Sequence, residues 1–252
     1  MLIGAIIQAR MGSTRLPRKV LMTIQGKPLI CHDLDQVSKS RLIKKIIVAT
    51  TTEKKDDVLA EEVEKYGYDV FRGSENDVLD RYYWCAKKFG IDVIVRVTAD
   101  CPLIDPEVVD TVISRFLEEP DCAYCSNVQP PTYPDGLDVE VMPFSAVERA
   151  WKEAKLASER EHVTPYIWKN ASRFNVVNVT NDKDLNWFRL TVDEKEDFIL
   201  VEKIYEKIKQ RPILLHDVME LFRKEPDLLM INSKFQRNEG YVKSLREDNV
   251  VI

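Results

Sequence analysis

Apolar, β-branched runs alternate with amphipathic stretches along the first 120 residues of the chain. Period-2 and continuous apolar runs are typical of strands, and apolar residues three or four positions apart are typical of helices. Strands that alternate with helices of ten to fifteen residues indicate right-handed βαβ units and a mainly parallel sheet. The pattern predicts strands at 2–9, 43–50, 68–73 and 92–100, and helices at 27–40, 56–67, 75–90 and 105–119.

After about residue 120 the alternation becomes irregular, which favours a mixed rather than purely parallel sheet. Strands are expected at 121–128, at the end of 129–141, at 174–180 and at 186–192, with two helices within 144–170 and further helices at 195–210 and 215–229. The sequence therefore predicts an α/β fold with a mainly parallel, mixed central sheet and flanking helices. We expect one domain over 1–210 and a C-terminal helical appendage with a charged tail over 211–252.

Net charge, the length of apolar runs and the number of cysteines exclude several classes of protein. The 252 residues carry a net charge of -5, which argues against general binding of nucleic acid. No apolar run approaches the roughly 18 residues of a membrane span, and the first residues lack the basic region of a signal peptide. Five cysteines in a chain of this size suggest reduced thiols. We therefore expect a cytoplasmic protein.

One cysteine pair has the spacing of metal ligands. Cys122 and Cys125 form a C-x-x-C motif, but no second pair follows it, and structural zinc sites need four ligands. In a strand, residues three apart point to opposite faces. We expect structural cysteines.

A basic loop with a single glycine follows the first predicted strand, which ends near Gln8. Parallel sheets bind ligands beyond the carboxyl ends of their strands. Gly12 lets the backbone approach a ligand closely, and the neighbouring cations suit phosphate groups; these are Arg10, Arg15, Arg18 and Lys19. The loop is neither a P-loop nor a G-x-G-x-x-G fingerprint. It predicts a polyphosphate site, with a solvated surface loop as the alternative.

Several motifs in order resemble one enzyme family. "IIQARMGSTRLPRKVL", "GKPLI", "VATT", "FRGSENDVLDRY", "VRVTADCPLIDP", "YPDGLDVEV", "SEREHVTPYI" and "FRLTVDEKEDF" cover roughly residues 1–210. They resemble the cytidylyltransferases that make CMP-activated acidic sugars, among them the CMP-sialic acid and CMP-Kdo synthetases and, most closely, the SpsF-like proteins of polysaccharide biosynthesis. The resemblance implies the nucleotide-diphospho-sugar transferase (GT-A-like) version of the α/β fold.

The resemblance also implies roles for individual residues. Lys19, Arg15 and Asp100 would be catalytic, and Asp100 and Asp193 would hold Mg²⁺. The alternatives are a turn or capping role for Asp100 and a helix N-cap role for Asp193. The triphosphate and nucleoside would contact residues in three segments: Ala9, Arg10, Gly12, Ser13, Thr14, Arg15 and Lys19; Arg72, Gly73, Ser74 and Asp77; Thr98 and Ala99. For Ser74 the alternative is an N-cap of the following helix.

The second half would contribute to an acceptor pocket and to a homodimer, with candidate residues Asp138, Glu140, Glu161 and His162. For His162 we favour a place beside the acceptor or at the dimer interface over direct proton abstraction. The expected reaction is Mg²⁺-dependent transfer of CMP from CTP to an anionic acceptor, with release of pyrophosphate, in polysaccharide or surface-glycan synthesis. The alternatives are transfer from another nucleoside triphosphate to a sugar 1-phosphate, and a non-catalytic nucleotide-binding protein.

Overall fold

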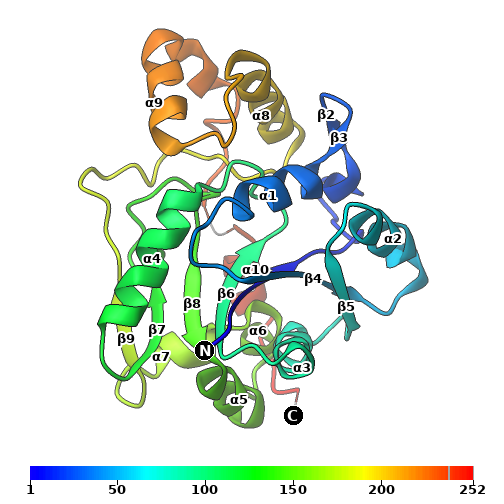
Figure 1. The fold of residues 1–252 in the computed structure, drawn as a ribbon, viewed down its shortest axis with the longest axis vertical. Coiled ribbons are helices and arrows are strands. Elements are labelled where there is room, and N and C mark those ends of the chain that lie inside the picture. Colours follow the sequence, from blue (N-terminus) through cyan, green and yellow to red (C-terminus); the bar gives the residue numbers. More distant parts are fainter. Residues whose placement is uncertain (238, 252) are drawn as a thin grey trace.

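A seven-stranded sheet forms the centre of the computed structural model, which describes residues 1–237 and 239–251 (Figure 1). Its strand order is β5-β4-β1-β6-β8-β7-β9. Strands β5, β4, β1 and β6 are parallel to one another. Strand β8 is antiparallel to β6 and β7, and β9 is parallel to β7. This confirms the predicted α/β fold with a mainly parallel, mixed sheet. The strands are β1 (Ile3–Gln8), β4 (Lys45–Thr51), β5 (Asp69–Gly73), β6 (Val93–Thr98), β7 (Cys122–Ser126), β8 (Glu140–Pro143) and β9 (Asn175–Asn178).

Helices cover both faces of the sheet. The apolar faces of α1 (Leu29–Val37), α2 (Asp57–Lys65) and α4 (Pro106–Glu118) share one buried cluster with β1 and β6. On the opposite face, a second cluster contains residues of α3 (Val78–Phe89), α5 (Phe144–Glu153) and α7 (Pro165–Lys169). The uninterrupted apolar strands that the sequence shows are therefore buried from both sides.

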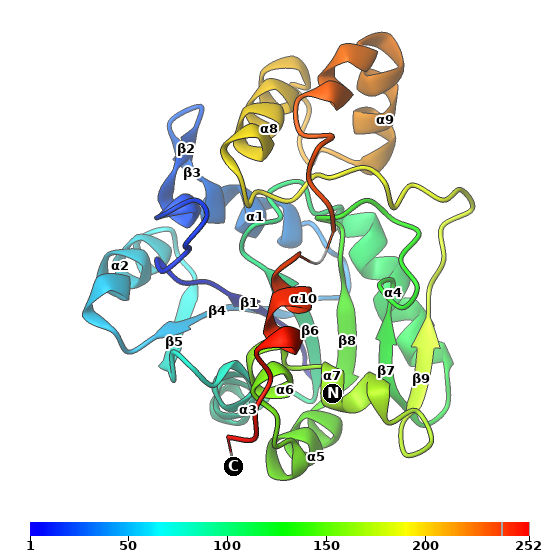
Figure 2. The same cartoon turned by 180° about the vertical axis from the view of Figure 1, so that it is seen from behind.

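The chain after residue 194 forms a third layer at one end of the sheet. A separate buried cluster joins α8 (Lys195–Lys207) and α9 (Leu215–Lys224) to Ile24, Leu29 and Leu103 of the first half. The last helix, α10 (Glu239–Arg246), lies against α6 (Ala157–His162) in front of β1 and β6 (Figure 2). The region expected to be an appendage thus packs on the sheet domain at two places.

The remaining elements are short. A two-stranded sheet pairs β2 (Thr23–Ile24) with β3 (Lys27–Pro28), just before α1. The described part of the chain also has three 3₁₀ helices, η1 (Lys19–Leu21), η2 (Lys54–Asp56) and η3 (Pro226–Met230).

Some sequence-based boundaries are wrong. The predicted strand 186–192 forms only one bridge, between Asp135 and Arg189. Its alternating apolar residues are Phe188, Leu190 and Val192, and they pack onto the α8 and α9 layer instead of a sheet face. The stretch 144–170 contains three helices, not two, because the chain turns at Ala154–Leu156 and at Val163 (φ 71°). Pro226 ends the helix expected over 215–229 and starts η3.

The cysteine prediction was half right. All five thiols are free and buried, as expected for structural cysteines. However, Cys122 and Cys125 lie in the same buried cluster rather than on opposite faces, while Tyr124 lies in the other. An irregularity between Cys122 and Tyr124 shifts the register by one residue, which cancels the alternation.

None of the helices in the described residues is long and apolar enough to cross a membrane.

Candidate active site

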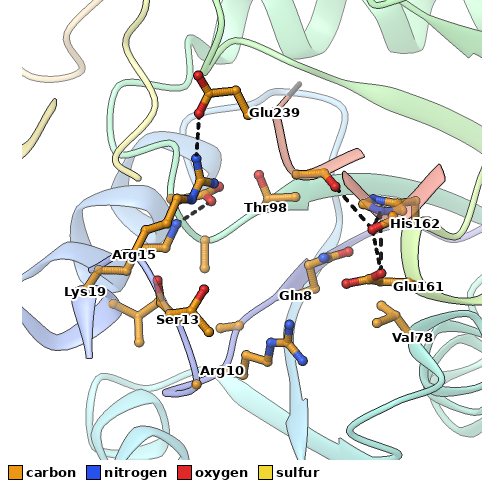
Figure 3. Close-up of a pocket in the computed structure, with 18 of the residues that line it drawn as sticks. Gln8, Arg10, Ser13, Arg15, Lys19, Val78, Thr98, Glu161, His162 and Glu239 are labelled. Atoms are coloured by element: carbon orange, nitrogen blue, oxygen red, sulfur yellow. Dashed lines mark hydrogen bonds and ion pairs between the residues drawn. The ribbon is translucent and has the colours of Figure 1, made fainter. Parts of the chain in front are cut away.

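A cavity of about 680 Å³ opens at the carboxyl ends of β1 and β6, where parallel sheets of this kind bind ligands (Figure 3). The basic loop after β1 forms one wall of it. The end of α6 and the C-terminal helix α10 form another. The lining residues include Gln8, Ala9, Arg10, Gly12, Ser13, Thr14, Arg15, Lys19, Val78, Arg81, Thr98, Ala99, Asp100, Glu161, His162, Glu239, Gly240, Ser244 and Glu247.

The basic loop is fixed at both ends by hydrogen bonds. Asp56 accepts a bond from the backbone N–H of Met11 at 2.6 Å. The N–H of Arg18 reaches back to the carbonyl of Met11 at 3.4 Å, and Arg18 itself has φ 61°. The loop is thereby folded back on itself, which brings Lys19 to the cavity within the first turn of η1.

Lys19 is the electrostatic centre of the site. Its ammonium nitrogen donates to Asp100 Oδ2 at 2.7 Å, to Asp193 Oδ1 at 2.8 Å and to the carbonyl of Val192 at 2.8 Å. Burial acts to lower the pKa of Lys19, but the two carboxylates outweigh it and raise that pKa above its ordinary value. For Asp100 burial acts to raise the pKa, yet the Lys19 charge lowers it to about 2. Asp100 and Lys19 are therefore both ionised at neutral pH.

Asp193 is held in place by neighbours that the sequence motifs did not single out. Arg189 donates to Asp193 at 3.2 Å and to Asp197 at 3.0 Å, and Asp197 accepts a further bond from the Asp193 N–H at 3.0 Å. The N-cap of α8 is Glu194, so the Asp193 side chain is not used as the cap. This leaves Asp193 facing Lys19 and the basic loop.

Arg15 connects the basic loop to the end of the chain. Its guanidinium lies 2.9 Å from Asp193, 3.7 Å from Glu194 and 3.6 Å from Glu239 on α10 (Figure 3). Every one of these partners is a carboxylate. A bound triphosphate would therefore have to compete with them for Arg15, as it would for Lys19.

The donor set around Lys19 suits a divalent cation. Asp100, Asp193 and the Val192 carbonyl direct three oxygen atoms at the point that the Lys19 ammonium occupies, and Mg²⁺ prefers one or two carboxylates together with phosphate oxygens and water. Throughout residues 1–237 and 239–251 no group of three or more His, Cys, Asp or Glu side chains has a metal-binding arrangement. The two carboxylates would thus need substrate oxygens to complete the shell.

None of the four residues of segment 72–77 that were predicted to contact the nucleoside lines the cavity, although Asp77 lines a neighbouring one of about 450 Å³. Arg72 donates to the carbonyls of Thr51 and Glu53 at 2.8 and 3.0 Å and pairs with Asp57, away from the cavity lining. Ser74 and Asp77 cap the start of α3, by bonds of 3.0 and 2.8 Å. Gly73 ends β5. The α3 residues that do reach the cavity are Val78 and Arg81, which stand in the same motif but were not among the predicted contacts.

The four acceptor-side candidates separate into two pairs. Glu140 is buried, pairs with Arg96 and accepts bonds of 2.6 Å from Tyr124 and Thr164, and Asp138 pairs with Arg237. Neither of these two carboxylates lines the cavity.

Glu161 and His162 do line the cavity, and both contact Ser244 of α10. His162 Nε2 lies 3.0 Å from Ser244 Oγ, whose hydroxyl can donate to Glu161 at 2.9 Å or to the Gly240 carbonyl at 3.2 Å. When the hydroxyl proton goes to Glu161 or to the Gly240 carbonyl, Nε2 is the donor to Ser244 and Nδ1 is left as an acceptor. Burial lowers the pKa of His162, so the ring is neutral at neutral pH.

Solved structures share this architecture. The structure of a cytidylyltransferase from Leptospira borgpetersenii superimposes with a TM-score of 0.89 and is 34% identical, covering 94% of this chain and 100% of that one. A CMP:2-keto-3-deoxy-manno-octonic acid synthetase complexed with CTP superimposes with a TM-score of 0.65 at 17% identity, over 82% of this chain and 99% of that one. At that identity the second likeness shows the fold alone.

Sequence comparison gives the same family. The spore coat polysaccharide biosynthesis protein SpsF of Bacillus subtilis is 33% identical over 231 residues, which are 88% of this chain and 94% of the relative. The model of a family described as cytidylyltransferase matches residues 4–240. The resemblance seen in the motifs is confirmed, and the chain belongs to the cytidylyltransferase family.

Proposed function

We propose that this chain transfers CMP from CTP to an anionic small-molecule acceptor in a Mg²⁺-dependent reaction that releases pyrophosphate. The convergence of Lys19, Asp100 and Asp193 beside the basic loop carries this proposal, because nucleotidyl transfer needs cations and a metal site at one point. The relative in Bacillus subtilis, named for spore coat polysaccharide synthesis, supports a role in making a surface glycan. The match to the cytidylyltransferase family and the 34% identical cytidylyltransferase of Leptospira borgpetersenii support CTP as the donor.

The chemistry is a displacement at the α-phosphorus of CTP. An acceptor oxygen forms a bond to this phosphorus, the bond to the oxygen bridging to the β-phosphorus breaks, and pyrophosphate leaves with that oxygen. A hydroxyl acceptor gives up its proton in the process. Mg²⁺ at Asp100 and Asp193 would neutralise phosphate oxygens. Lys19 and Arg15, once released from their carboxylates, bind the leaving pyrophosphate and stabilise its growing charge.

The rest of the cavity suits an acceptor with both a negative group and hydroxyl groups. Arg10 lines this cavity and a neighbouring one of about 450 Å³, so its guanidinium can reach an anionic group on either side. Glu161 and His162 Nδ1 present hydrogen-bond acceptors, which suit hydroxyl groups. A sugar acid has both kinds of group.

Two measurements test the proposal. CTP with Mg²⁺ should raise the melting temperature more than equal concentrations of ATP, GTP or UTP, because a ligand stabilises the state that it binds. Pyrophosphate release should then require both CTP and a member of a panel of sugar acids, phosphonates and sugar 1-phosphates, and EDTA should stop it. Preference for another nucleotide together with a sugar 1-phosphate would instead favour transfer from that nucleoside triphosphate to a sugar 1-phosphate. Binding without release for any acceptor would favour a non-catalytic protein.

A matched pair of variants tests the shared metal. Asp100→Asn and Asp193→Asn should each remove most of the turnover while CTP binding survives in part. The double variant should lose much less than the sum of the two losses in activation free energy, because both carboxylates would act through one ion. Fully additive losses would exclude a shared ion.

A further inference from the structure

Gln8 ends β1, and within residues 1–237 and 239–251 it is the only amide side chain that lines the main cavity. Its Oε1 accepts a hydrogen bond of 3.2 Å from Nε of Arg96 on the neighbouring strand β6. Because a guanidinium can only donate, this bond fixes which way the amide is turned. The oxygen of Gln8 faces Arg96, and the NH₂ group faces away from it.

The NH₂ group of Gln8 is unpartnered and accessible. No hydrogen bond joins Nε2 to another described residue, and Nε2 is not one of the unpartnered polar atoms that are shielded from solvent. In Figure 3 Gln8 lies between the Glu161–His162 pair and the basic loop, whose residues line the same cavity. At the end of β1 the cavity therefore presents a neutral group that can only donate hydrogen bonds.

Two charged residues hold the Gln8 amide in this orientation. Arg96 pairs with Glu140 on β8, and Glu140 also accepts bonds of 2.6 Å from Tyr124 and Thr164. Burial acts to lower the pKa of Arg96, but the Glu140 charge outweighs it and raises that pKa. Arg96 therefore remains charged, and a flipped amide would set N–H donors against each other.

Other groups of the same cavity make the opposite demand on a ligand. Glu161 and His162 Nδ1 accept hydrogen bonds, so they suit hydroxyl groups. The Gln8 amide suits an oxygen that accepts, and a carboxylate offers two such oxygens without a proton. The cations of the basic loop are the groups proposed to bind the triphosphate. A molecule that carries both hydroxyl groups and a carboxylate thus matches the part of the cavity between Gln8 and α6.

We propose that Gln8 determines acceptor specificity by donating from Nε2 to a carboxylate of the acceptor, and that Arg96 and Glu140 are positioning residues that act through it. This inference rests on the proposed function and deepens it, because it gives the anionic group of the acceptor a chemical class and a binding residue. It also gives Glu140, which the sequence placed at the acceptor, a role that needs no contact with the cavity.

The first test compares a sugar acid with its carboxamide. The sugar acid is the member of a panel of 3-deoxy-manno-octulosonate, N-acetylneuraminate, glucuronate and gluconate that gives the fastest pyrophosphate release with CTP and Mg²⁺. Gln8→Glu keeps the shape of the side chain but presents a charged oxygen. Its ratio of kcat/KM for the acid over that for the carboxamide should fall about a hundredfold or more, because a carboxylate would meet a like charge. Gln210→Glu, at an exposed position after α8, is the control and should keep the wild-type ratio.

The second test separates binding of the acceptor from folding. Gln8→Met should raise the KM of the sugar acid about tenfold, while the Kd of CTP with Mg²⁺, measured by isothermal titration, stays within about twofold of the wild type. Arg96→Lys keeps a charge beside Glu140 but has no Nε to hold the amide, so it should raise the same KM in the wild type. In the Gln8→Met background it should leave that KM unchanged, because Arg96 acts only through Gln8. A merely structural role of Arg96 would raise the KM equally in both backgrounds.

The outcomes separate this inference from the proposed function. A wild type that releases pyrophosphate with no acceptor of any class would contradict the proposed function, and this inference with it. Release with phosphonates but with no sugar acid would overturn this inference and leave CMP transfer standing. A wild-type ratio of acid to carboxamide in Gln8→Glu would overturn the role of Gln8 alone. Weakening of CTP binding as large as the rise in KM would make Gln8 a nucleotide contact and would likewise overturn it.

Discussion

At the scale of single residues, Lys19 is held by the groups that its substrate would displace. Both of its carboxylate partners are the proposed metal ligands. Mg²⁺ bound to Asp100 and Asp193 would free Lys19 to bind the triphosphate, and a triphosphate bound to Lys19 would free the two carboxylates to bind Mg²⁺. We therefore expect CTP to bind much more weakly without Mg²⁺, and Mg²⁺ more weakly without CTP. Reciprocity of this kind is a requirement of linkage between two ligands.

Removal of the Lys19 charge should impair turnover more than folding. We expect Lys19→Ala to lower the rate of pyrophosphate release about a hundredfold or more, as for other lost electrostatic stabilisers. Arg15→Lys should also slow release, because lysine cannot form a forked phosphate contact. Lys39→Ala, at an exposed position, is the control. Near-normal rates in both site variants would mean that the loop is a solvated surface.

Asp33 offers a prediction about pH and stability. It is fully buried on α1, its carboxyl oxygens have no hydrogen-bond partner among the described residues, and burial, with the Asp100 charge adding to it, raises its pKa well above the usual range. A group with a raised folded-state pKa binds more protons folded than unfolded, so its ionisation costs stability as the pH rises above the unfolded pKa. Asp33→Asn should increase the free energy of unfolding at pH 8, and this gain should shrink towards pH 4. Urea titrations at the two pH values measure it; an equal change at both would contradict the assignment.

At this scale the sequence predicts which charged residues belong to the site, but it does not always predict whether their side chains face the cavity. Lys19 and Asp100 follow β1 and β6, whose carboxyl ends a parallel sheet brings to one edge. Asp193 follows a segment outside the sheet, which backbone bonds to Asp100 and Asp135 hold at that edge. Arg72 and Arg81 stand in one motif, but Arg72 lies on β5 and Arg81 on α3, and whether Arg81 faces the cavity depends on how α3 is rotated against the sheet. That rotation comes from the packing of the whole helix and is not encoded within the motif.

At the scale of elements, the connection 127–139 supports the segment that carries Asp193. Asp135 accepts a backbone bond of 2.7 Å from Leu190, and the N–H of Val192 donates to the carbonyl of Asp100 at 2.8 Å. The segment 186–192 is thus extended and hydrogen-bonded without joining the sheet. Its alternating apolar residues do pack into the core, but Arg189 and Thr191 between them are buried too. The pattern could not show that helices, rather than a neighbouring strand, bury them.

Gly136 makes this contact between two connections possible. Its φ is 101°, and a Cβ atom there would lie 2.5 Å from the backbone nitrogen of Thr191. Gly136→Ala should lower the free energy of unfolding by about 2 kcal/mol or more, from backbone strain together with the displaced segment. Pyrophosphate release should fall as well, since Asp193 follows directly. The control is Gly67→Ala, which has a similar strain (φ 94°) but open space around its Cβ; an equal loss of activity there would contradict the link to the site.

At the scale of the whole molecule, the large aromatic side chains of the second half, which the resemblance assigns to a homodimer, are mostly packed within one chain. Trp151 stacks on Tyr83 at 4.1 Å, and Tyr166 is only 8% exposed. Trp84 remains 43% exposed beside this stack. We still expect a homodimer, the commonest closed assembly. Light scattering at micromolar concentration should give twice the chain mass of 29.2 kDa, and a single-chain mass would contradict it.

The distance along the chain between Lys19 and Asp193 has a consequence during translation. The two residues are 174 positions apart. At 5–20 residues per second, a ribosome needs roughly 9 to 35 s to add the residues between them. For that time the nascent chain carries Lys19 with only Asp100 of its two carboxylate partners. Until residue 193 leaves the exit tunnel, the excess positive charge of the basic loop is open to cellular polyanions, and the proposed metal site is incomplete.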